Sequence, residues 1–238
     1  MTIGIIGFGS FGKFLAEKLS SSAHVKVYDR RDRDMTWRAS FEEVAQCDYV
    51  IPSVPIEAYA AVLAQLAQHM PSTSVLVDVC SVKERAVELI RAHLPDHTIV
   101  ATHPLFGPES ASVSLQGHTL VMCPEVSDEA QYSKVKACAQ EAGLEVVEMS
   151  ASEHDREMAV VQGLTFFIAR TLDVMKVHDQ RLSAPSFQRL LSLAELELHH
   201  SPELFRTIQQ GNARTRDVRR QFLDVAVAIH NELEGKTR

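Results

Sequence analysis

Short apolar runs rich in β-branched residues alternate with amphipathic segments through the first 150 residues. The runs predict strands, and the helical spacing of apolar residues between them predicts helices. This repeated strand–helix order is typical of a doubly wound, mostly parallel sheet, so the predicted fold class is α/β. The predicted strands are Thr2–Ile6, His24–Asp29, Asp48–Ser53, Ser74–Val79, Thr98–Thr102, His118–Cys123 and Leu144–Met149.

Local signals mark some of the helix boundaries. Ser40 with Glu43, and Ser81 with Glu84, have the spacing of a capping box, in which each side chain bonds the backbone N–H of the other residue. Gly143 is predicted to cap the C-terminus of a helix, because glycine tolerates the left-handed backbone needed there. These signals agree with the strand positions.

The pattern changes after residue 150, where strand-like alternation disappears and helical spacing continues. Ser152 with Asp155 predicts the start of a long helix running to about His178, and prolines further along predict later helix starts. We therefore predict two domains, a Rossmann-type domain over residues 1–150 and an all-helical domain over residues 151–238.

The stretch after Ser201 is predicted to form one long helix with much apolar surface. That surface needs a cover, either another part of the same domain or a second copy of the chain. Because a small helical domain without a large core favours pairing, we predict a homodimer. Its apolar positions include Leu204, Ile208, Val218, Phe222, Val225, Ala226 and Ile229.

Charge and cysteine usage narrow the functional classes. The chain has 238 residues, a formal net charge of −7 and no polybasic block, which argues against nucleic acid or an anionic membrane as partner and favours a small-molecule substrate. Its four cysteines lack metal-site or disulfide spacing and are predicted to be free thiols in a reducing cytoplasm. The apolar start has no basic region and meets glycine early, so neither a signal peptide nor a membrane span is expected.

A dinucleotide-binding signature follows the first predicted strand. It reads Gly7-Phe8-Gly9-Ser10-Phe11-Gly12 and opens a helix. Gly7 permits the tight turn, Gly9 lets the backbone approach a pyrophosphate, and Gly12 allows close packing of helix and strand. The segment predicts an NAD or NADP site.

The end of the second predicted strand bears on the choice of cofactor. Asp29 is placed to bond an adenosine ribose, which favours NAD. Arg30 and Arg31 leave NADP open, because adjacent guanidiniums can bind a 2′-phosphate, although a solvated charged turn is the simpler interpretation. Ser53 and Pro55 follow another strand at the same sheet edge and are predicted to line the cofactor cleft.

Two further polar segments follow apolar strands. They read Asp78-Val79-Cys80-Ser81-Val82-Lys83 and His103-Pro104-Leu105-Phe106-Gly107-Pro108-Glu109-Ser110. In this order after a glycine loop, they resemble the D-x-x-S-V-K and H-P-M-F-G-P-[ED]-S segments of the prephenate/arogenate dehydrogenases of tyrosine biosynthesis. The later His154-Asp155 pair resembles that family's H-D pair, so the resemblance spans nearly the whole chain.

The resemblance implies oxidative decarboxylation of a cyclohexadienyl alcohol. A hydride leaves the hydroxyl-bearing ring carbon for NAD(P), the ring carboxylate leaves as carbon dioxide, and the ring becomes aromatic. His103 is the implied general base, as suits an imidazole near neutrality. Ser81 would orient that imidazole or the nicotinamide, or it would simply cap a helix. Lys83 would offer a cation to a carboxylate or phosphate, or it would be an exposed surface charge.

Other site residues follow from the same resemblance. Gly107 is expected to shape the loop that presents His103, and His154 to reach the substrate site. Family members usually carry a second histidine where this chain has Phe166, and no arginine stands at the position expected for binding a substrate carboxylate. Arg189, Arg214 and Arg216 are displaced candidates for that role.

Two alternatives remain open from the sequence. One is a reductase of an imine or a 3-hydroxy acid, which would leave the histidine segment unexplained. The other is a nucleotide-sensing homologue that kept the fold but lost turnover.

Overall fold

The computed structural model describes residues 1–31, 34–125, 128–198 and 200–235. The chain separates into two compact units, Met1–His154 and Asp155–Arg238, and the sequence-based boundary after residue 150 falls just before this division. Helices of the described ranges are all too short or too polar to span a membrane.

The N-terminal unit is built on one seven-stranded sheet with the order β2-β1-β3-β4-β5-β6-β7. Neighbouring strands are parallel except β5 and β6, which run antiparallel. All seven predicted strands form, with ends that differ from the prediction by two residues at most. Their bounds are β1 Thr2–Ile6, β2 His24–Tyr28, β3 Tyr49–Pro52, β4 Val75–Asp78, β5 Thr98–Pro104, β6 Thr119–Cys123 and β7 Glu145–Glu148.

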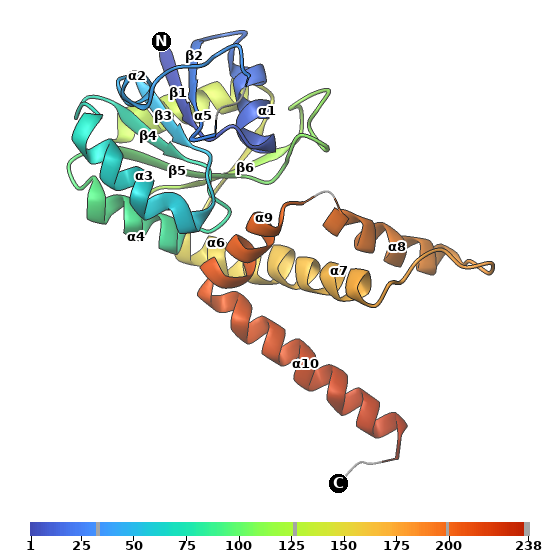
Figure 1. The fold of residues 1–238 in the computed structure, drawn as a ribbon. Coiled ribbons are helices and arrows are strands. Elements are labelled where there is room, and N and C mark those ends of the chain that lie inside the picture. The colour runs from blue at the N-terminus through green and yellow to red at the C-terminus, as the bar shows by residue number, and fades with distance from the viewer. Residues whose placement is uncertain (32–33, 126–127, 199, 236–238) are drawn as a thin grey trace. The chain divides into compact units, whose positions relative to one another are not determined.

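Helices cover both faces of this sheet, because successive strand residues point to opposite sides and both sides are apolar. One core joins side chains of α2, α3 and α4 to strand residues that include Val50 and Leu76. The other joins α1 and α5 to residues that include Ile5 and Val77. The predicted doubly wound arrangement is therefore confirmed (Figure 1). The helices are α1 Ser10–Leu19, α2 Phe41–Ala45, α3 Ile56–His69, α4 Glu84–His93 and α5 Glu129–Glu141.

The strand order reverses beside β1, which has β2 on one side and β3 on the other. Ile6 at the end of β1 pairs with Tyr28 and with Pro52. Ligands of open α/β sheets bind outside the carboxyl ends of the strands at such a point. The glycine loop after β1 and the turn after β3 lie there.

Two of the predicted helix boundaries are confirmed and one is wrong. Ser40 and Glu43 form a complete capping box at the start of α2. Gly143 follows α5 with a φ of +88°, in the left-handed region. Ser81 does not cap α4, which begins at Glu84 with Lys83 at the N-cap position. The reason is that Val82 and Lys83 turn their side chains into the protein, which delays the helix.

The second unit is helical, as predicted. The helix α6 Ala151–Met158 begins before the division between the units and ends after it. The elements that follow are the π-helical turn η1 Ala159–Leu164, α7 Thr165–Val174, α8 Pro185–Leu198, α9 Pro202–Arg206, the π-helical turn η2 Thr207–Gly211 and α10 Ala213–Leu233. The residues predicted to cap the start of α6 are wrong, because another pair two residues earlier does so. Ser150 and Glu153, rather than Ser152 and Asp155, exchange the capping bonds: Ser150 Oγ accepts from Glu153 N at 3.2 Å and Glu153 Oε2 accepts from Ser150 N at 2.9 Å.

The single long helix predicted after Ser201 is also wrong, because the chain breaks at Asn212. This residue has an extended backbone, and its side chain accepts from Arg214 N, which starts α10 as a new helix. Its Nδ2 donates to the carbonyl oxygen of Asp155 at 2.6 Å. A buried side chain that bonds at both ends thus divides the apolar pattern into two helices.

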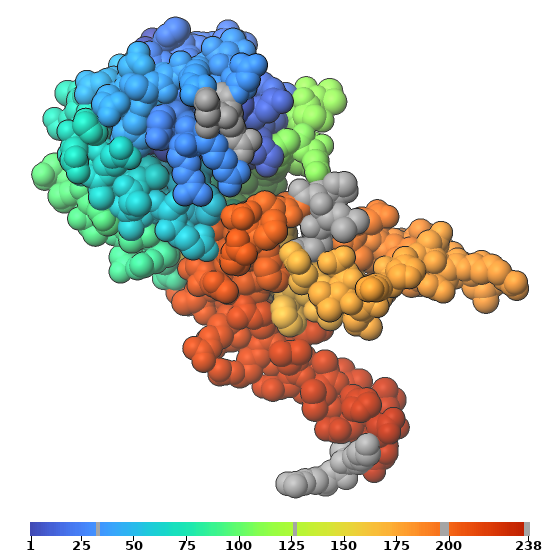
Figure 2. Space-filling view, viewed as in Figure 1, coloured from blue at the N-terminus to red at the C-terminus, as the bar shows by residue number. Residues whose placement is uncertain are grey.

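The last helix leaves much apolar surface in contact with solvent. The exposed side chains on α10 are Leu223, Val225, Val227, Ile229 and Leu233. In the space-filling view, atoms of this helix, drawn in red, are visible on the face of the protein that is shown (Figure 2). Such a face is typical of a surface that another chain covers.

Candidate active site

The glycine loop has the backbone that its sequence predicts. Gly7 has a φ of +104°, and an added Cβ there would lie 2.3 Å from the Ser53 carbonyl oxygen. A Cβ on Gly12 would lie 2.0 Å from the Gly7 carbonyl oxygen, whereas one on Gly9 would meet no described atom within 4 Å. Gly7 and Gly12 are therefore required by packing, and Gly9 borders open space.

The helix after this loop begins with exposed residues. Gly9 is the N-cap of α1, the first turn contains no acidic residue, and Ser10 is exposed while Phe11 is half-buried. Unpaired backbone N–H groups and the helix dipole make such an end suitable for a phosphate. The geometry fits the pyrophosphate of a dinucleotide, which the glycine loop would hold.

The turn after β3 forms one wall of this loop. Ser53 N donates to the carbonyl oxygen of Ile6 at 2.7 Å, and Ser53 is half-buried. Pro55 is exposed and is the N-cap of α3. Both residues thus lie at the sheet edge where the sequence places them.

Asp29 lies at the carboxyl end of β2 and touches the glycine loop. Its Oδ2 accepts from Phe8 N at 2.7 Å, and its Oδ1 accepts from Arg31 N at 2.8 Å. A pocket of about 440 Å³ adjoins it and is also lined by Tyr28, Arg38 and Glu43. Arg30 is exposed beside this region, and residues 32 and 33 of the charged turn lie outside the described residues.

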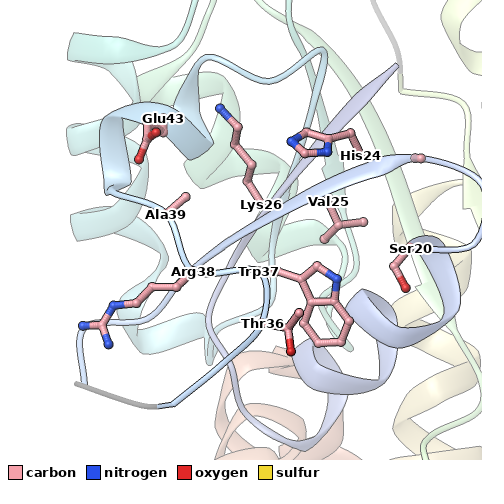
Figure 3. Close-up of a pocket in the computed structure, with 10 residues that line it drawn as sticks. Ser20, His24, Val25, Lys26, Thr36, Trp37, Arg38, Ala39 and Glu43 are labelled. Atoms are coloured by element: carbon pink, nitrogen blue, oxygen red, sulfur yellow. The ribbon is translucent and has the colours of Figure 1, made fainter.

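A second pocket, of about 310 Å³, follows the outer edge of β2 (Figure 3). Its lining includes His24, Lys26 and Trp37, and the Trp37 ring centroid is 6.4 Å from that of Phe8. It extends toward the amino end of the strand, away from the carboxyl edge where cofactors bind. We assign it no role in the predicted site.

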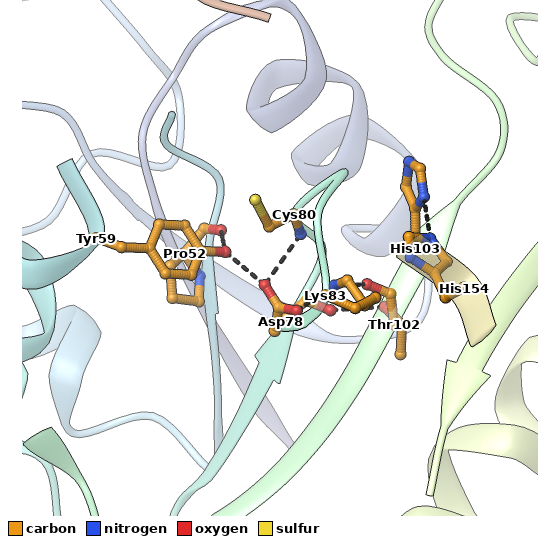
Figure 4. A network of polar contacts seen from close by, with 8 residues as sticks. All are labelled: Pro52, Tyr59, Asp78, Cys80, Lys83, Thr102, His103 and His154. Atoms are coloured by element: carbon orange, nitrogen blue, oxygen red, sulfur yellow. Dashed lines mark hydrogen bonds and ion pairs between the residues drawn. The ribbon is translucent and has the colours of Figure 1, made fainter. Parts of the chain in front are cut away.

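A buried polar network lies at the ends of β4 and β5 (Figure 4). Asp78 and Lys83 are both completely buried, and Lys83 Nζ donates to Asp78 Oδ2 and to the Thr102 carbonyl oxygen. Asp78 Oδ1 accepts from the Tyr59 hydroxyl at 2.6 Å and from Cys80 N at 3.0 Å. Burial, followed by the charge of Asp78, raises the pKa of Tyr59 well above its usual value, so the phenol remains protonated and donates.

His103 stands beside this network with a second histidine. Its Nδ1 is 2.8 Å from Nε2 of His154, and the exposed fractions of the two residues are 3% and 0%. Burial lowers the pKa of His103 well below its usual 6.5, and the nearby His154 and Lys83 lower it further. His103 is therefore neutral near neutral pH, as a general base must be.

The predicted role of Lys83 needs a correction. As an exposed surface charge or a direct ligand contact it would need access to solvent, but its side chain is 0% exposed and is ion-paired with Asp78. Ser81 is half-buried in the turn between β4 and α4, and Glu84 does not form a capping box with it. Ser81 is thus released from the structural role that competed with a catalytic one.

The loop after His103 contacts the helix of the glycine loop. Phe106 packs edge-on against Phe14 of α1 with ring centroids 6.3 Å apart. Gly107 N donates to Ser110 Oγ at 3.1 Å, which closes a turn. This contact brings two segments nearly a hundred residues apart to the same side of the sheet.

Known proteins resemble this chain in both sequence and fold. The family profile for the nucleotide-binding domain of prephenate dehydrogenase matches residues 20–148, and the profile for its dimerization domain matches residues 150–238. This chain belongs to the prephenate dehydrogenase family.

Curated relatives carry related names. Chloroplastic arogenate dehydrogenase 1 of Arabidopsis thaliana is 32% identical over 214 residues, which cover 82% of this chain and 33% of that protein. Cyclohexadienyl dehydrogenase of Zymomonas mobilis is 28% identical, with coverage of 89% and 80%. The chain spans about a third of the Arabidopsis protein and 58% of another curated relative.

Solved structures show the same fold. The prephenate dehydrogenase of Aquifex aeolicus, in complex with hydroxyphenyl propionate and NAD+, gives a TM-score of 0.73 at 21% identity over 98% of this chain and 92% of that one. The arogenate dehydrogenase of Synechocystis gives 0.70 at 19% identity over 98% and 93%.

The helical unit of this family member holds the remaining candidates. Phe166 is buried, with its ring centroid 4.8 Å from that of His200, so an apolar contact occupies the position where a histidine is expected. Arg214 is half-buried in the first turn of α10, while Arg189 and Arg216 are exposed. Their role as substrate contacts stays a prediction.

Sequence reasoning missed Tyr59 and Thr102 as parts of the site, and it named Asp78 within a motif but gave it no role. Tyr59 lies on α3 and has no motif of its own, and Thr102 was assigned only to a strand. Asp78 carried a usable signal, because an acidic residue that ends an otherwise apolar strand must find a partner once buried, and Lys83 follows five residues later.

Proposed function

We propose that this protein catalyses NAD(P)-dependent oxidative decarboxylation of prephenate or arogenate in tyrosine biosynthesis. The observation that carries the proposal is the buried neutral His103, which lies near the carboxyl end of β5, at the edge of the sheet that also holds the glycine loop. Family membership and the names of the relatives support the same chemistry.

His103 acts as the general base in this proposal. The bound nicotinamide supplies the acceptor for the hydride, and His103 takes the proton of the ring hydroxyl as the carbonyl forms. Loss of carbon dioxide then makes the ring aromatic. A positioned base of this kind contributes about a hundredfold to ten-thousandfold in rate.

His154 selects the form of His103 that can accept a proton. In a hydrogen bond between two neutral imidazoles one nitrogen donates and the other accepts. If His103 Nδ1 donates to His154 Nε2 across their 2.8 Å contact, His103 Nε2 is left with a free lone pair for the substrate. His154 is fully buried, so we assign it this positioning role rather than direct substrate contact.

Ser81 and Gly107 complete the substrate side. The Ser81 hydroxyl is not needed as a helix cap, which supports its use in orienting the nicotinamide or the substrate hydroxyl. Gly107 lies in the turn closed by Ser110 and shapes the loop that follows His103. Arg214 is our candidate for binding a substrate carboxylate, a task suited to a guanidinium.

The cofactor is NAD in preference to NADP. Gly7, Gly9 and Gly12 hold the pyrophosphate through the backbone, and Asp29 lies where a ribose would bind. The preference rests on the Asp29 carboxylate, which would repel a 2′-phosphate. Arg30 and Arg38 stand nearby, so titration of the protein with each cofactor by calorimetry tests this choice directly, and tighter binding of NADP would reverse it.

Homodimerisation through the helical unit is part of the proposal. The match to a dimerization domain and the exposed apolar side chains of α10 support it. A dimer is expected in sedimentation, and Val225→Asp with Ile229→Asp should yield monomers.

The buried free thiols Cys47, Cys80 and Cys123 support a reducing, cytoplasmic location.

The activity is tested by initial rates of NADH or NADPH formation, with prephenate and arogenate each offered with both cofactors. Turnover with one pair identifies substrate and cofactor together. Absence of turnover with all four combinations of substrate and cofactor, in protein that binds cofactor, would contradict the proposal and favour a nucleotide-sensing role. The buried Phe166 in place of a histidine is the observation that favours this second candidate.

A further inference from the structure

The completely buried ion pair of Asp78 and Lys83 has no evident value for folding alone. Removing two charges from water costs more than their attraction usually returns, so apolar residues of similar size often serve stability equally well. Here each charge is supplied with further hydrogen bonds, from Tyr59 and Cys80 to Asp78 and from Lys83 to Thr102. A pair satisfied in this way holds its neighbours in one arrangement.

The pair joins three segments that are separate in the sequence. Asp78 ends β4, and its backbone carbonyl oxygen accepts from Thr102 Oγ1 of β5 at 2.7 Å. The carboxylate also holds Cys80 N, in the turn that leads to α4. Lys83 closes that turn and reaches back to the carbonyl oxygen of Thr102. The ends of both strands and the intervening turn are therefore bound to one buried charge pair.

Both proposed catalytic residues are attached to these anchor points. Ser81 lies between Cys80 and Lys83, which are both held by Asp78, and His103 directly follows Thr102, whose carbonyl oxygen accepts from Lys83. A shift of Lys83 would thus move both residues. Figure 4 shows Lys83 directed toward Asp78 and Thr102, with the histidine pair beside them.

We propose that Lys83 is a positioning residue, which acts through Asp78 and the Thr102 carbonyl group to hold Ser81 and His103 in register and does not touch substrate or cofactor. The inference rests on the proposed function, since it assigns a task to that same site. Its charge also acts on His103: a buried cation opposes protonation of the imidazole, together with His154 of α6, the other titratable group in contact with it.

The test uses the full chain carrying both Asp78→Asn and Lys83→Met. The double variant removes both charges together, so neither is left buried without its partner, which a single substitution would do. We expect it to fold and to bind cofactor within about twofold of the wild type, because the glycine loop is untouched. We expect kcat to fall about tenfold to a hundredfold, the loss typical of misplaced reacting groups, with little change in KM.

The acidic limb of the kcat profile provides a readout that a merely structural role would not move. Without the Lys83 cation the pKa of His103 rises, so the base stays protonated to higher pH. The acidic limb of the kcat profile therefore shifts to higher pH. The control is Lys136→Met, which removes a lysine from an ion pair with Glu148 elsewhere in the same unit. It should leave both kcat and the limb unchanged.

Titration of His103 by NMR, in wild type and double variant, separates this inference from the proposed function. A higher pKa in the variant supports the inference even if the wild type turns over neither ring substrate, in which case only the proposed function fails. An unchanged titration overturns it, as does an unchanged kcat profile in an active wild type.

Discussion

The two halves of the candidate site are built in different ways. The glycine loop takes its shape from backbone that is local in sequence, Gly7 to Gly12, with one wall from Ser53. The proposed base, His103, is held by side chains drawn from α3, β4, β5 and α6, up to 95 residues apart between Tyr59 and His154. The cofactor half should therefore respond to added volume, and the catalytic half to lost charge or hydrogen bonds.

His103→Ala should give the largest effect and mark the catalytic half. We expect kcat to fall about a hundredfold to ten-thousandfold, because the base is removed. Cofactor affinity should stay near that of the wild type, since the glycine loop is intact. Rates measured at saturating substrate, with calorimetry for the cofactor, check both. Retention of most of the kcat would show that another group is the base.

Gly12→Ala should damage the cofactor half through packing. Its Cβ would lie 2.0 Å from a backbone oxygen that cannot move freely, so we expect a loss of about 1–3 kcal/mol in the free energy of unfolding and weaker cofactor binding. Urea denaturation measures the first and calorimetry the second.

Gly9→Ala is the matched control, because its Cβ enters open space. Stability should change by less than about 0.5 kcal/mol while cofactor affinity falls, since the methyl group occupies the approach to the phosphates. Equal stability losses in the two variants would argue against the packing explanation.

Acid should weaken the catalytic half through His103. Its pKa in the folded protein lies well below 6.5, so below pH 6.5 the unfolded chain binds a proton that the folded one does not, and stability falls with pH until the folded pKa is reached. This single group adds a slope approaching about 1.4 kcal/mol per pH unit. The free energy of unfolding, measured from pH 7 downward, should fall less steeply with pH in His103→Gln than in the wild type. Identical slopes in the two proteins would contradict the buried neutral state of His103.

Tyr59→Phe should have a much smaller effect on kcat than His103→Ala. Asp78 Oδ1 loses the phenol donor but keeps Cys80 N, so we expect about 1 kcal/mol less stability and a kcat loss of a few-fold. Tyr132→Phe is the control. The Tyr132 hydroxyl donates to Glu148 Oε1 at a distance of 2.9 Å, and neither residue belongs to the candidate site. It should cost similar stability in a urea titration and leave kcat unchanged. If both variants lost kcat equally, the network would have no special link to the base.

The cofactor half was predictable from the sequence because its determinants are local. The glycine spacing, the preceding strand and Asp29 at the next strand end all lie within the first 29 residues, and the structure places them together. The catalytic half was predictable only in part. The motifs named Ser81, Lys83 and His103, yet the burial of Lys83 was missed, because a lysine in a first helical turn is usually exposed.

Helix ends also could be predicted only where the contacts that fix them are local in sequence. Ser40 caps its helix as its spacing predicts, whereas Ser81 has the same spacing and does not, because the neighbouring Lys83 is bound inside by Asp78. The break at Asn212 escaped prediction for a similar reason, since its side chain is held by the carbonyl oxygen of Asp155, 57 residues away.

The sequence by itself determined the order of strands and helices, the glycine loop and the family, because periodicity and short motifs act over a few residues. Only the tertiary structure decided that Lys83 faces Asp78, that Tyr59 joins them, and that His103 meets His154. Those contacts depend on which strand ends lie side by side and how completely they exclude water. Burial is what turns ordinary ionisable side chains into a pair of fixed charges and a neutral imidazole.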